Sequence, residues 1–366
     1  MLIKRIAFLG PSEAIHFKRW IKYFSEKNWE VAYIGFNNNL NEYEKYLKKI
    51  YIINPGIKKI QKILCLKKYI NDFKPSIIIF HYIDYKILFC LFTKNIPIIL
   101  CCYGYDVFKA PRLSIFFKYV FRYIGNYKAQ LIISIAEHMT RELIEYIGIK
   151  KDKIYTSSWG CDTKIFFRNK NIERSEKKIR IICPRGFEPH YNWQTIIKAI
   201  KIVVSKNENY EFIFTNSGRE EEAAKKMVKD FQLEKCVKFL GLISPEEMAI
   251  EYNKSHIYIS MSLIDGNNIS LNEAMNCGCF PICSNTPATK QWIINEYNGL
   301  IMVDNFSAEE LAEKILSVEY YSDKIQNMLK INFEIIKQKA DFYKNLSKIE
   351  DILGTGVTSS PHFFIL

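Results

Sequence analysis

Short apolar runs alternate with longer amphipathic segments along most of this 366-residue chain. Residues 6–9 form such a run and predict a buried strand, whereas residues 15–26 repeat apolar side chains at helical spacing and predict a helix. The same criteria predict further elements in the first half, namely strands at 31–34, 77–80, 98–102 and 131–134 and a helix at 137–146. Strands that alternate with helices favour an α/β fold in which helices cover both faces of a parallel sheet.

A second series of alternating elements follows a polar segment that lacks apolar periodicity. Its predicted strands are 179–183, 211–215, 237–240, 257–260 and 280–283, and its predicted helices are 193–204, 220–231, 245–253 and 270–276. We therefore predict one α/β domain at residues 1–168, a linker at 169–178, a second α/β domain at 179–335, and a C-terminal segment at 336–366. Two such domains would leave a cleft between them, which is a favoured place for a small ligand.

Composition and cysteine usage narrow the class of protein. An apolar content of 48% with 25% charged residues is typical of a globular chain. No stretch approaches the roughly 18 uncharged apolar residues of a membrane span, and the first residues lead directly into a predicted strand rather than a signal peptide. We therefore expect a cytoplasmic protein whose ten cysteines are reduced. Cys277, Cys279 and Cys283 are closely spaced, but zinc sites need a second cysteine pair or histidines, so we expect no metal site.

Positive charge is concentrated in the first half of the chain. Residues 1–170 carry a net charge of +16, whereas residues 171–366 carry −3. Basic side chains are interleaved with aromatic and aliphatic ones at 45–68 and at 109–128, a pattern that suits the surface of an anionic membrane. Solvated helix faces are the simpler alternative. Nucleic acid is a weaker one, because no nucleic-acid-binding motif accompanies the charge. We predict an anionic membrane surface as a partner, and no nucleic acid.

The segment from Asp265 to Glu273 is the strongest candidate site. Its two carboxylates lie eight residues apart around a turn at Gly266, between a predicted strand and a predicted helix. Asp265 would then lie where the strand leaves the sheet and Glu273 in the first turn of the helix, at the edge where α/β proteins bind ligands. The backbone N–H groups that would suit a pyrophosphate there belong to Asn268, Ile269 and Ser270. Ser270 and Glu273 also fit a capping box, which requires only that a helix begins there.

The second half of the chain resembles family 4 glycosyltransferases, also called group 1 glycosyltransferases. Their pattern is Glu-Gly, six further residues, Glu-Ala-Met-x-x-Gly, a strand, and a turn that ends in Asn-Gly. This chain has the matching residues at the same spacing: Asp265-Gly266, Glu273-Ala274-Met275, Gly278 and Asn298-Gly299, with Val237 to Gly241 upstream. The first half agrees more loosely, at residues 15–20, 103–107 and 159–166, and residues 339–344 resemble the family's closing helix.

The resemblance implies the GT-B fold, which consists of two Rossmann-like domains with parallel sheets facing across a cleft. The first domain would bind the acceptor and the second the nucleotide sugar, and a helix within 336–366 would cross back to the first domain. The implied reaction is a retaining, metal-independent and cofactor-free transfer of a hexose from a nucleotide sugar to a glycan or polyprenyl-linked glycan. Together with the basic segments at 45–68 and 109–128, this predicts a reaction at the inner face of the membrane, in the synthesis of cell-surface polysaccharides or glycoconjugates.

The resemblance also suggests roles for individual residues. Arg185 would hold the donor diphosphate, Glu273 the ribose hydroxyls and Asp265 the hydroxyls of the transferred sugar, so Asp265 and Arg185 are the catalytic candidates. The other predicted donor contacts are Gly266, Asn268, Ile269, Ser270, His190 and Leu242. The predicted acceptor contacts in the first domain are His16, His81 and Asp106.

Three positions depart from the family pattern. Asp265 is one methylene shorter than the family's glutamate. His190 occupies the position of the lysine that usually accompanies Arg185, and a histidine common in the acceptor domain is replaced near Tyr103. Two other functions therefore stay open, a nucleotide-sugar epimerase of the same fold and a catalytically degenerate protein that binds a sugar nucleotide. A nicotinamide-dependent oxidoreductase is disfavoured, because the turn that begins at Gly10 is not G-x-G-x-x-G.

Overall fold

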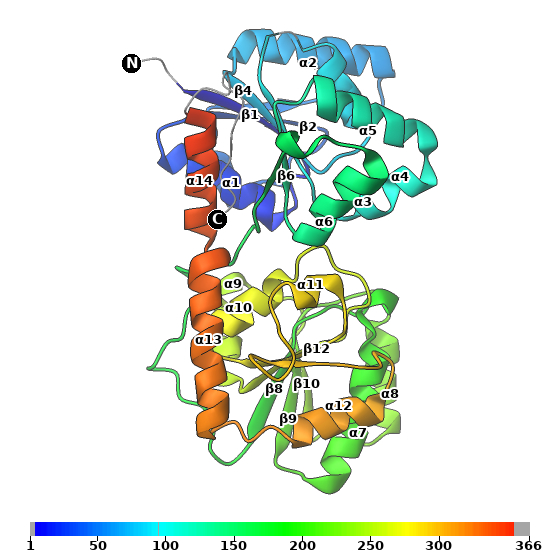
Figure 1. Cartoon of the computed structure of the whole chain (residues 1–366), viewed down its shortest axis with the longest axis vertical. Coiled ribbons are helices and arrows are strands. Elements are labelled where there is room, and N and C mark those ends of the chain that lie inside the picture. The colour runs from blue at the N-terminus through cyan, green and yellow to red at the C-terminus, as the bar shows by residue number, and fades with distance from the viewer. Residues whose placement is uncertain (1–3, 94, 355–366) are drawn as a thin grey trace. The chain divides into compact units, whose positions relative to one another are not determined.

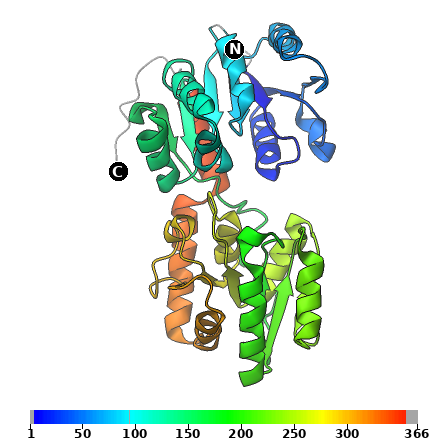
Figure 2. The same cartoon turned by 90° about the vertical axis from the view of Figure 1, so that its right-hand side faces the viewer.

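The computed structural model describes residues 4–93 and 95–354. The described chain divides into two compact units, one that runs to Ser157 and includes Glu350 to Gly354, and one that comprises Ser158–Ile349. Each unit is an α/β body in which helices cover the faces of a sheet (Figure 1). The layers of each unit can be followed from the side in Figure 2.

The sheet of the first unit is entirely parallel, with the strand order β3-β2-β1-β4-β5-β6-β7. Its strands are β1 (Arg5–Leu9), β2 (Glu30–Gly35), β3 (Lys49–Ile52), β4 (Ile77–His81), β5 (Ile98–Cys101), β6 (Leu131–Ser134) and β7 (Ile154–Thr156). Its helices are α1 (Ile15–Glu26), α2 (Lys59–Phe73), α3 (Tyr105–Phe108), α4 (Ala110–Leu113), α5 (Ile115–Tyr127) and α6 (Glu137–Glu142), which continues as a π-helical turn at Leu143–Ile147. Short 3₁₀ turns lie at Asn41–Tyr46, Tyr85–Leu91 and Lys151–Lys153.

The second unit repeats the arrangement with the order β10-β9-β8-β11-β12-β13, again with all strands parallel. Its strands are β8 (Ile179–Cys183), β9 (Tyr210–Phe214), β10 (Val237–Phe239), β11 (Ile257–Ser260), β12 (Phe280–Cys283) and β13 (Leu300–Ile301). Its helices are α7 (Trp193–Lys206), α8 (Glu221–Asp230), α9 (Pro245–Lys254), α10 (Ile269–Asn276), α11 (Pro287–Lys290), α12 (Ala308–Leu316) and α13 (Asp323–Lys339), with a 3₁₀ turn at Pro189–Tyr191. The last helix, α14 (Phe342–Gly354), begins in this unit, and its end from Glu350 is assigned to the first.

These observations confirm the predicted α/β class with two parallel sheets. The central strands are buried along their whole length, as their continuous apolar runs require. In the first unit Phe8 packs against Phe17, Trp20 and Phe24 of α1. In the second unit α12 packs on α7 and α13 packs on α10, one pair to each side of the sheet (Figure 1).

The predicted linker at 169–178 lies inside the second unit. There Arg174 donates to the carbonyl of Cys277 (2.9 Å) and to the hydroxyl of Tyr320. The division between the units falls instead after Ser157. A polar segment without periodicity is compatible with a linker, but it is equally compatible with an ordered strand-free segment that is held by side-chain hydrogen bonds. Residues 355–366 of the predicted C-terminal segment lie outside the described residues.

The basic segment at 45–68 is not a single surface. Residues 49–52 form the edge strand β3, which the pattern did not reveal. Lys48 and Lys49 reach acidic side chains from other elements, with Nζ at 3.9 Å from Glu30 and 3.6 Å from Asp72. Lysines of this segment that are exposed and form no ion pair with a described residue are Lys45, Lys58, Lys59, Lys67 and Lys68, whereas Lys62 is only partly exposed.

Candidate active site

Arg185 and Asp265 follow the two strands between which the order of the second sheet reverses. Arg185 comes two residues after β8 and Asp265 five residues after β11, and these strands are neighbours in the sheet. Ligands of open α/β sheets bind at the carboxyl ends of the strands where the order reverses. The backbone also joins the two loops, because the N–H of Leu263 donates to the carbonyl of His190 at 2.8 Å.

The guanidinium of Arg185 is held on three sides. Its Nη2 donates to Asp265 Oδ2 at 2.9 Å, its Nη1 lies 3.3 Å from Ser270 Oγ, and its plane lies over the ring of Tyr191 at 4.5 Å from the centroid. The side chains of Arg185 and Asp265 are only 19% and 11% exposed. A pairing of Arg185 with Glu188, the simplest structural reason for an arginine here, does not occur, because Glu188 pairs with Arg219 at 2.7 Å. Arg185 is thus fixed among groups from the loop after β8, the loop after β11 and α10.

The N-terminus of α10 carries the predicted pyrophosphate-binding segment, but its cap differs from the expected one. Asn268 is the N-cap, and its side chain accepts a hydrogen bond from the N–H of Leu271 at 3.2 Å. Ser270 is therefore the second residue of the helix and not its cap, so the alternative explanation of Ser270 and Glu273 as a capping box does not apply. Both asparagine and serine are good caps, so the sequence alone did not separate them.

This register places Glu273 fifth in α10, in the second turn rather than the first. Its side chain is partly exposed, and its negative charge contributes, after burial, to raising the pKa of Tyr252. A buried tyrosine, Tyr258 of β11, supports the start of the same helix with its hydroxyl at 3.0 Å from Asn268 Oδ1 and 2.9 Å from Ser270 Oγ.

The remaining predicted donor residues lie along the same edge of the sheet. Gly266 and Ile269 are partly exposed, and His190 lies in the turn after β8 with an exposed side chain. Leu242 follows β10 and is 78% exposed, and the carbonyl of the preceding Gly241 accepts from the N–H of Asn216 at 2.6 Å. The loops that follow β8, β9, β10 and β11 are thus all represented at this edge.

Two glycines allow the loops after β8 and β9 to approach closely. A Cβ at Gly186 would lie 2.4 Å from the carbonyl oxygen of Ser217, and one at Gly218 would lie 2.5 Å from the backbone nitrogen of Phe187. Contacts this short to backbone atoms cannot be relieved by a side-chain rotation. Any larger residue would therefore move the loop that carries Arg185.

In the first unit, His16 and His81 lie where the strand order reverses between β1 and β4. His81 ends β4 and is buried, with its ring against Trp20 at 4.8 Å and its Nδ1 at 2.8 Å from the hydroxyl of Tyr103. Burial, together with the charge of Arg19, lowers the pKa of His16 to about 3. Burial, together with His16, lowers the pKa of His81 to about 3. Both imidazoles are therefore neutral at neutral pH.

Asp106 does not fit its predicted role as an acceptor contact. It is completely buried, and its carboxylate accepts hydrogen bonds from the N–H groups of Ile83 (3.0 Å), Tyr103 (3.0 Å) and Gly104 (2.7 Å). It joins the loop after β4 to the loop after β5, and burial raises its pKa to about 6 even though these bonds oppose the rise. Sequence reasoning could not separate this structural aspartate from a binding one.

Tyr191 and Tyr258 were missed as members of the site around Arg185. Tyr258 lay within a predicted strand, where an inward-facing tyrosine looks like an ordinary core residue. Nothing in the sequence singled out Tyr191. Within the described ranges, no group of three or more histidine, cysteine or acidic side chains is arranged to hold a metal ion. Over the same residues, no helix is both long and apolar enough to cross a bilayer.

Comparison with known proteins identifies the class to which this fold belongs. The model of the family described as glycosyl transferases group 1 matches residues 164–332, and that described as glycosyl transferase 4-like matches residues 5–136. Together these matches cover most of both units, and the chain belongs to the group 1, or family 4, glycosyltransferases of GT-B fold.

Individual relatives are distant. An uncharacterized glycosyltransferase of Methanocaldococcus jannaschii is 26% identical over 261 residues, which are 65% of this chain and 63% of the relative. The GPI3 subunit of the phosphatidylinositol N-acetylglucosaminyltransferase of Saccharomyces cerevisiae is 22% identical over 184 residues, 48% of this chain and 40% of that protein. The chain thus matches less than two thirds of the length of either relative.

A solved structure agrees over nearly the whole chain. The HepE protein of Anabaena, crystallised with UDP and glucose, superposes with a TM-score of 0.79 at 14% identity. The alignment covers 96% of this chain and all of that one. The agreement at this low identity establishes the fold.

Proposed function

We propose that the protein transfers a sugar from a nucleotide sugar to a glycan or lipid-linked glycan, with retention of the anomeric configuration and without a metal ion. The observation that carries the proposal is the group formed by Arg185, Asp265 and the N-terminus of α10 at the reversal of strand order. Departure of a nucleoside diphosphate adds negative charge to the phosphate oxygens, and preorganised donors stabilise that charge as it develops. A guanidinium and free helical N–H groups are donors of this kind.

Each residue has a proposed role in this reaction. Arg185 and the N–H groups at Ile269 and Ser270 bind the diphosphate, and Glu273, on the partly exposed side of α10, accepts from the ribose hydroxyls. Asp265 accepts from hydroxyls of the transferred sugar. In the HepE structure the ligands are UDP and glucose, which supports a nucleotide diphosphate as the leaving group here. His16 and His81, both neutral, contribute to acceptor binding by the first unit.

The acceptor is proposed to be lipid-linked, with the protein on an anionic membrane surface. Helix α5 supports this with a row of aromatic side chains at helical spacing, of which Phe116 is 69% and Tyr127 67% exposed. Tyr119 and Tyr123 complete the row, and Leu113 and Ile115 extend it at its start. The exposed cations Lys109, Arg122 and Lys128 accompany these side chains. The phosphatidylinositol substrate in the name of the yeast relative is consistent with such an acceptor.

The test is to incubate the protein with a panel of nucleotide sugars and a polyprenyl-phosphate-linked or free glycan acceptor, with a chelator present. The expected result is a glycosylated acceptor whose new linkage, by NMR, has the anomeric configuration of the donor. An epimerised nucleotide sugar without transfer would instead identify the epimerase. Donor binding without any turnover across the panel would identify a degenerate binding protein.

A further inference from the structure

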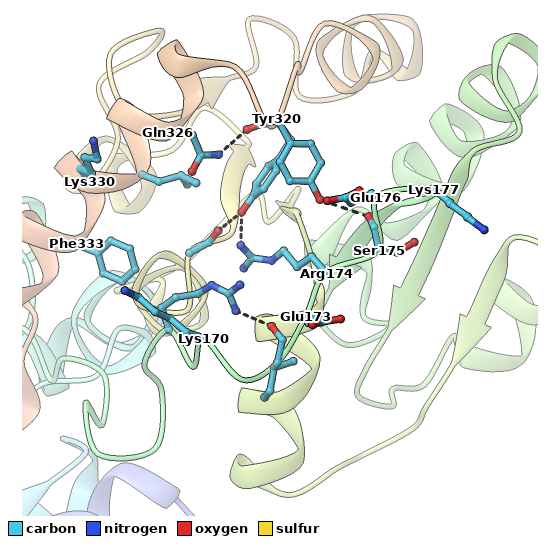
Figure 3. A pocket seen from close by; sticks show the side chains of 15 residues that line it. Lys170, Glu173, Arg174, Ser175, Glu176, Lys177, Tyr320, Gln326, Lys330 and Phe333 are labelled. Atoms are coloured by element: carbon cyan, nitrogen blue, oxygen red, sulfur yellow. Dashed lines mark hydrogen bonds between the residues drawn. The ribbon is translucent and has the colours of Figure 1, made fainter.

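The second unit contains a cavity of about 840 Å³ that is separate from the edge of the sheet where Arg185 and Asp265 lie. It is formed by the segment from Arg168 to Lys177, the turn at Tyr320 and Tyr321, the first half of α13, and Gly278 (Figure 3). Gly278 lies between the end of α10 and the start of β12, at the amino ends of the strands. The cavity therefore opens near the opposite edge of the sheet from the donor residues, and its volume is in the range of small-molecule sites.

Positive charge dominates the lining. Five lysine and arginine side chains contribute to it against two carboxylates, and both carboxylates, Glu173 and Glu176, are exposed. Lys177 extends away from the cavity in Figure 3, whereas Lys170 lies on the wall that carries Phe333. Across the described residues, neither Arg168 nor Arg174 forms an ion pair with a carboxylate.

The two arginines lie close together. A Cβ at Gly278, which has a φ of +81°, would lie 3.3 Å from Arg168 Cδ and 3.5 Å from Arg174 Nη2. Burial and the nearby charge of Arg174 lower the pKa of Arg168. Two part-buried guanidinium groups side by side repel each other, and an anion between or beside them would remove that repulsion.

One donor edge of Arg168 is available. Its Nη1 makes all of its protein hydrogen bonds, to oxygens of Asn169, Ile172 and Asn253 at 3.0–3.4 Å. Its Nε and Nη2 have no partner in the described part of the protein. These two N–H groups form the edge of a guanidinium that binds two oxygens of a phosphate at once. Arg174 has fewer N–H groups available for a ligand, because it donates hydrogen bonds to the hydroxyl of Tyr320 and to the carbonyl of Cys277.

We propose that this cavity binds a small phosphorylated molecule, with its phosphate on the Nε and Nη2 edge of Arg168 and in the field of Arg174, Lys170 and Lys330. The cavity is larger than a phosphate, and the organic part of the ligand occupies the remaining volume and packs against Tyr320 and Phe333. This site goes beyond the proposed glycosyl transfer and does not depend on it, because none of its residues belongs to the donor site.

The test uses inorganic pyrophosphate as the probe, measured by calorimetry at low ionic strength, where exposed lysines are least screened. We expect the parent protein to bind two equivalents, one at each site, and the Arg185→Gln variant to retain one. In the Arg185→Gln background, Arg168→Gln should weaken the remaining binding by about tenfold or more, as expected for the loss of a charged bidentate contact. Lys170→Gln with Lys330→Gln should also weaken it, without disturbing the hydrogen bonds of the segment that Arg168 holds.

The matched control is Lys198→Gln, which removes an exposed lysine of α7 that does not line the cavity. It should leave the affinity unchanged. The proposal is overturned if Arg185→Gln binds no pyrophosphate, or if the Lys170 and Lys330 variant binds it as tightly as its background. If instead the proposed donor site is wrong, the parent protein should bind no nucleotide sugar but should still bind one equivalent of pyrophosphate in the cavity.

Discussion

Asp265 Oδ2 lies 2.9 Å from Arg185 Nη2, so the residue predicted to hold the transferred sugar is paired with the residue predicted to hold the diphosphate. The pair is largely buried, and breaking a buried pair costs more than breaking an exposed one. The shorter side chain of aspartate, in place of the glutamate expected from the resemblance, is compatible with this contact. The two proposed roles are therefore coupled, and they must be separated by substitutions at both positions.

Replacement of Asp265 by alanine should lower turnover more than nucleotide affinity. The variant loses a contact to the sugar, whereas Arg185 keeps its hydroxyl contact to Ser270 and gains freedom to meet the diphosphate. A loss of about 1.5–3 kcal/mol in the transition state corresponds to roughly a tenfold to hundredfold lower kcat. Steady-state kinetics with several donors measure the change in kcat, and calorimetry with the nucleoside diphosphate measures the change in nucleotide affinity. Parental kcat in both Asp265→Ala and Asp265→Glu would reduce Asp265 to a turn residue.

Arg185→Ala and Glu273→Gln should each weaken nucleotide-sugar binding by about 1.5–3 kcal/mol, because each removes a charged partner of the donor. Titration calorimetry gives the dissociation constants directly. The matched control is Arg219→Gln, since Arg219 is an exposed arginine that pairs with Glu188 in the neighbouring loops. If the control weakens binding as much as the two site variants do, the effect is one of general charge and the site assignment fails.

The stability of the first unit should fall as the pH drops below about 6.5. An unfolded histidine takes up its proton near that pH, whereas folded His81 does so only near pH 3, so protons bind preferentially to the unfolded chain between these values. Its contribution is complete above pH 6.5 and decreases by up to about 1.4 kcal/mol per pH unit below it. Thermal unfolding from pH 8 to pH 4.5 should show the parent losing more stability than His81→Gln. Parallel curves for the two proteins would contradict the buried, neutral state of His81.

Vesicles that contain anionic lipid should retain the protein, and high salt should release it. Replacing Phe116, Tyr119 and Tyr123 of α5 by serine should reduce sedimentation with these vesicles, because it removes the exposed aromatic row. Replacing Lys58, Lys59 and Lys62 by glutamate should do the same through charge. The control is Tyr297→Ser, an exposed aromatic of the second unit. Equal sedimentation with neutral and anionic vesicles would exclude the membrane surface as a partner and favour a soluble acceptor.

Asn272→Leu should stabilise the protein. Asn272 is completely buried in α10, and neither polar atom of its amide has a hydrogen-bond partner among residues 4–93 and 95–354. Burial of an unpartnered amide costs about 1–3 kcal/mol, and leucine has a similar size without that cost. Differential scanning calorimetry should show a higher Tm, and donor affinity should be retained because Glu273 and Ser270 are unchanged. A lower Tm would mean that Asn272 has a partner that leucine cannot replace.

Strand and helix positions could be predicted because each depends on a local pattern. Residues 131–134, 179–183, 257–260 and 280–283 have the same bounds as the strands observed, and the helix at 15–26 is also reproduced. The edge strand β3 escaped because it is half-exposed and rich in lysine and tyrosine, so it has no continuous apolar run. Patterns over a few residues contain little information about such edge elements.

The candidate site was predictable in location but not in its contacts. The rule that ligands bind at the carboxyl edge of a parallel sheet placed Asp265 and Glu273 at the site, and the resemblance to the family added Arg185. The direct pairing of Arg185 with Asp265 joins residues 80 positions apart through side-chain conformations, which a sequence does not specify. Asp106 shows the converse, because its three backbone partners come from two loops that only the folded sheet brings together.

Helix α10 has eight residues and is therefore only about 12 Å long, yet its two ends have different neighbours. Ser270 near its start contacts Arg185, and the carbonyl of Cys277 at its end accepts from Arg174. A ligand that drew Arg174 away from that carbonyl would leave the negative end of the helix with less compensating charge. If such a ligand changed the affinity for the donor by some factor, the donor would change the affinity for the ligand by the same factor, because coupling between binding sites is reciprocal. The affinity of the donor site would then depend on the concentration of the ligand in the cavity, with α10 connecting the two sites.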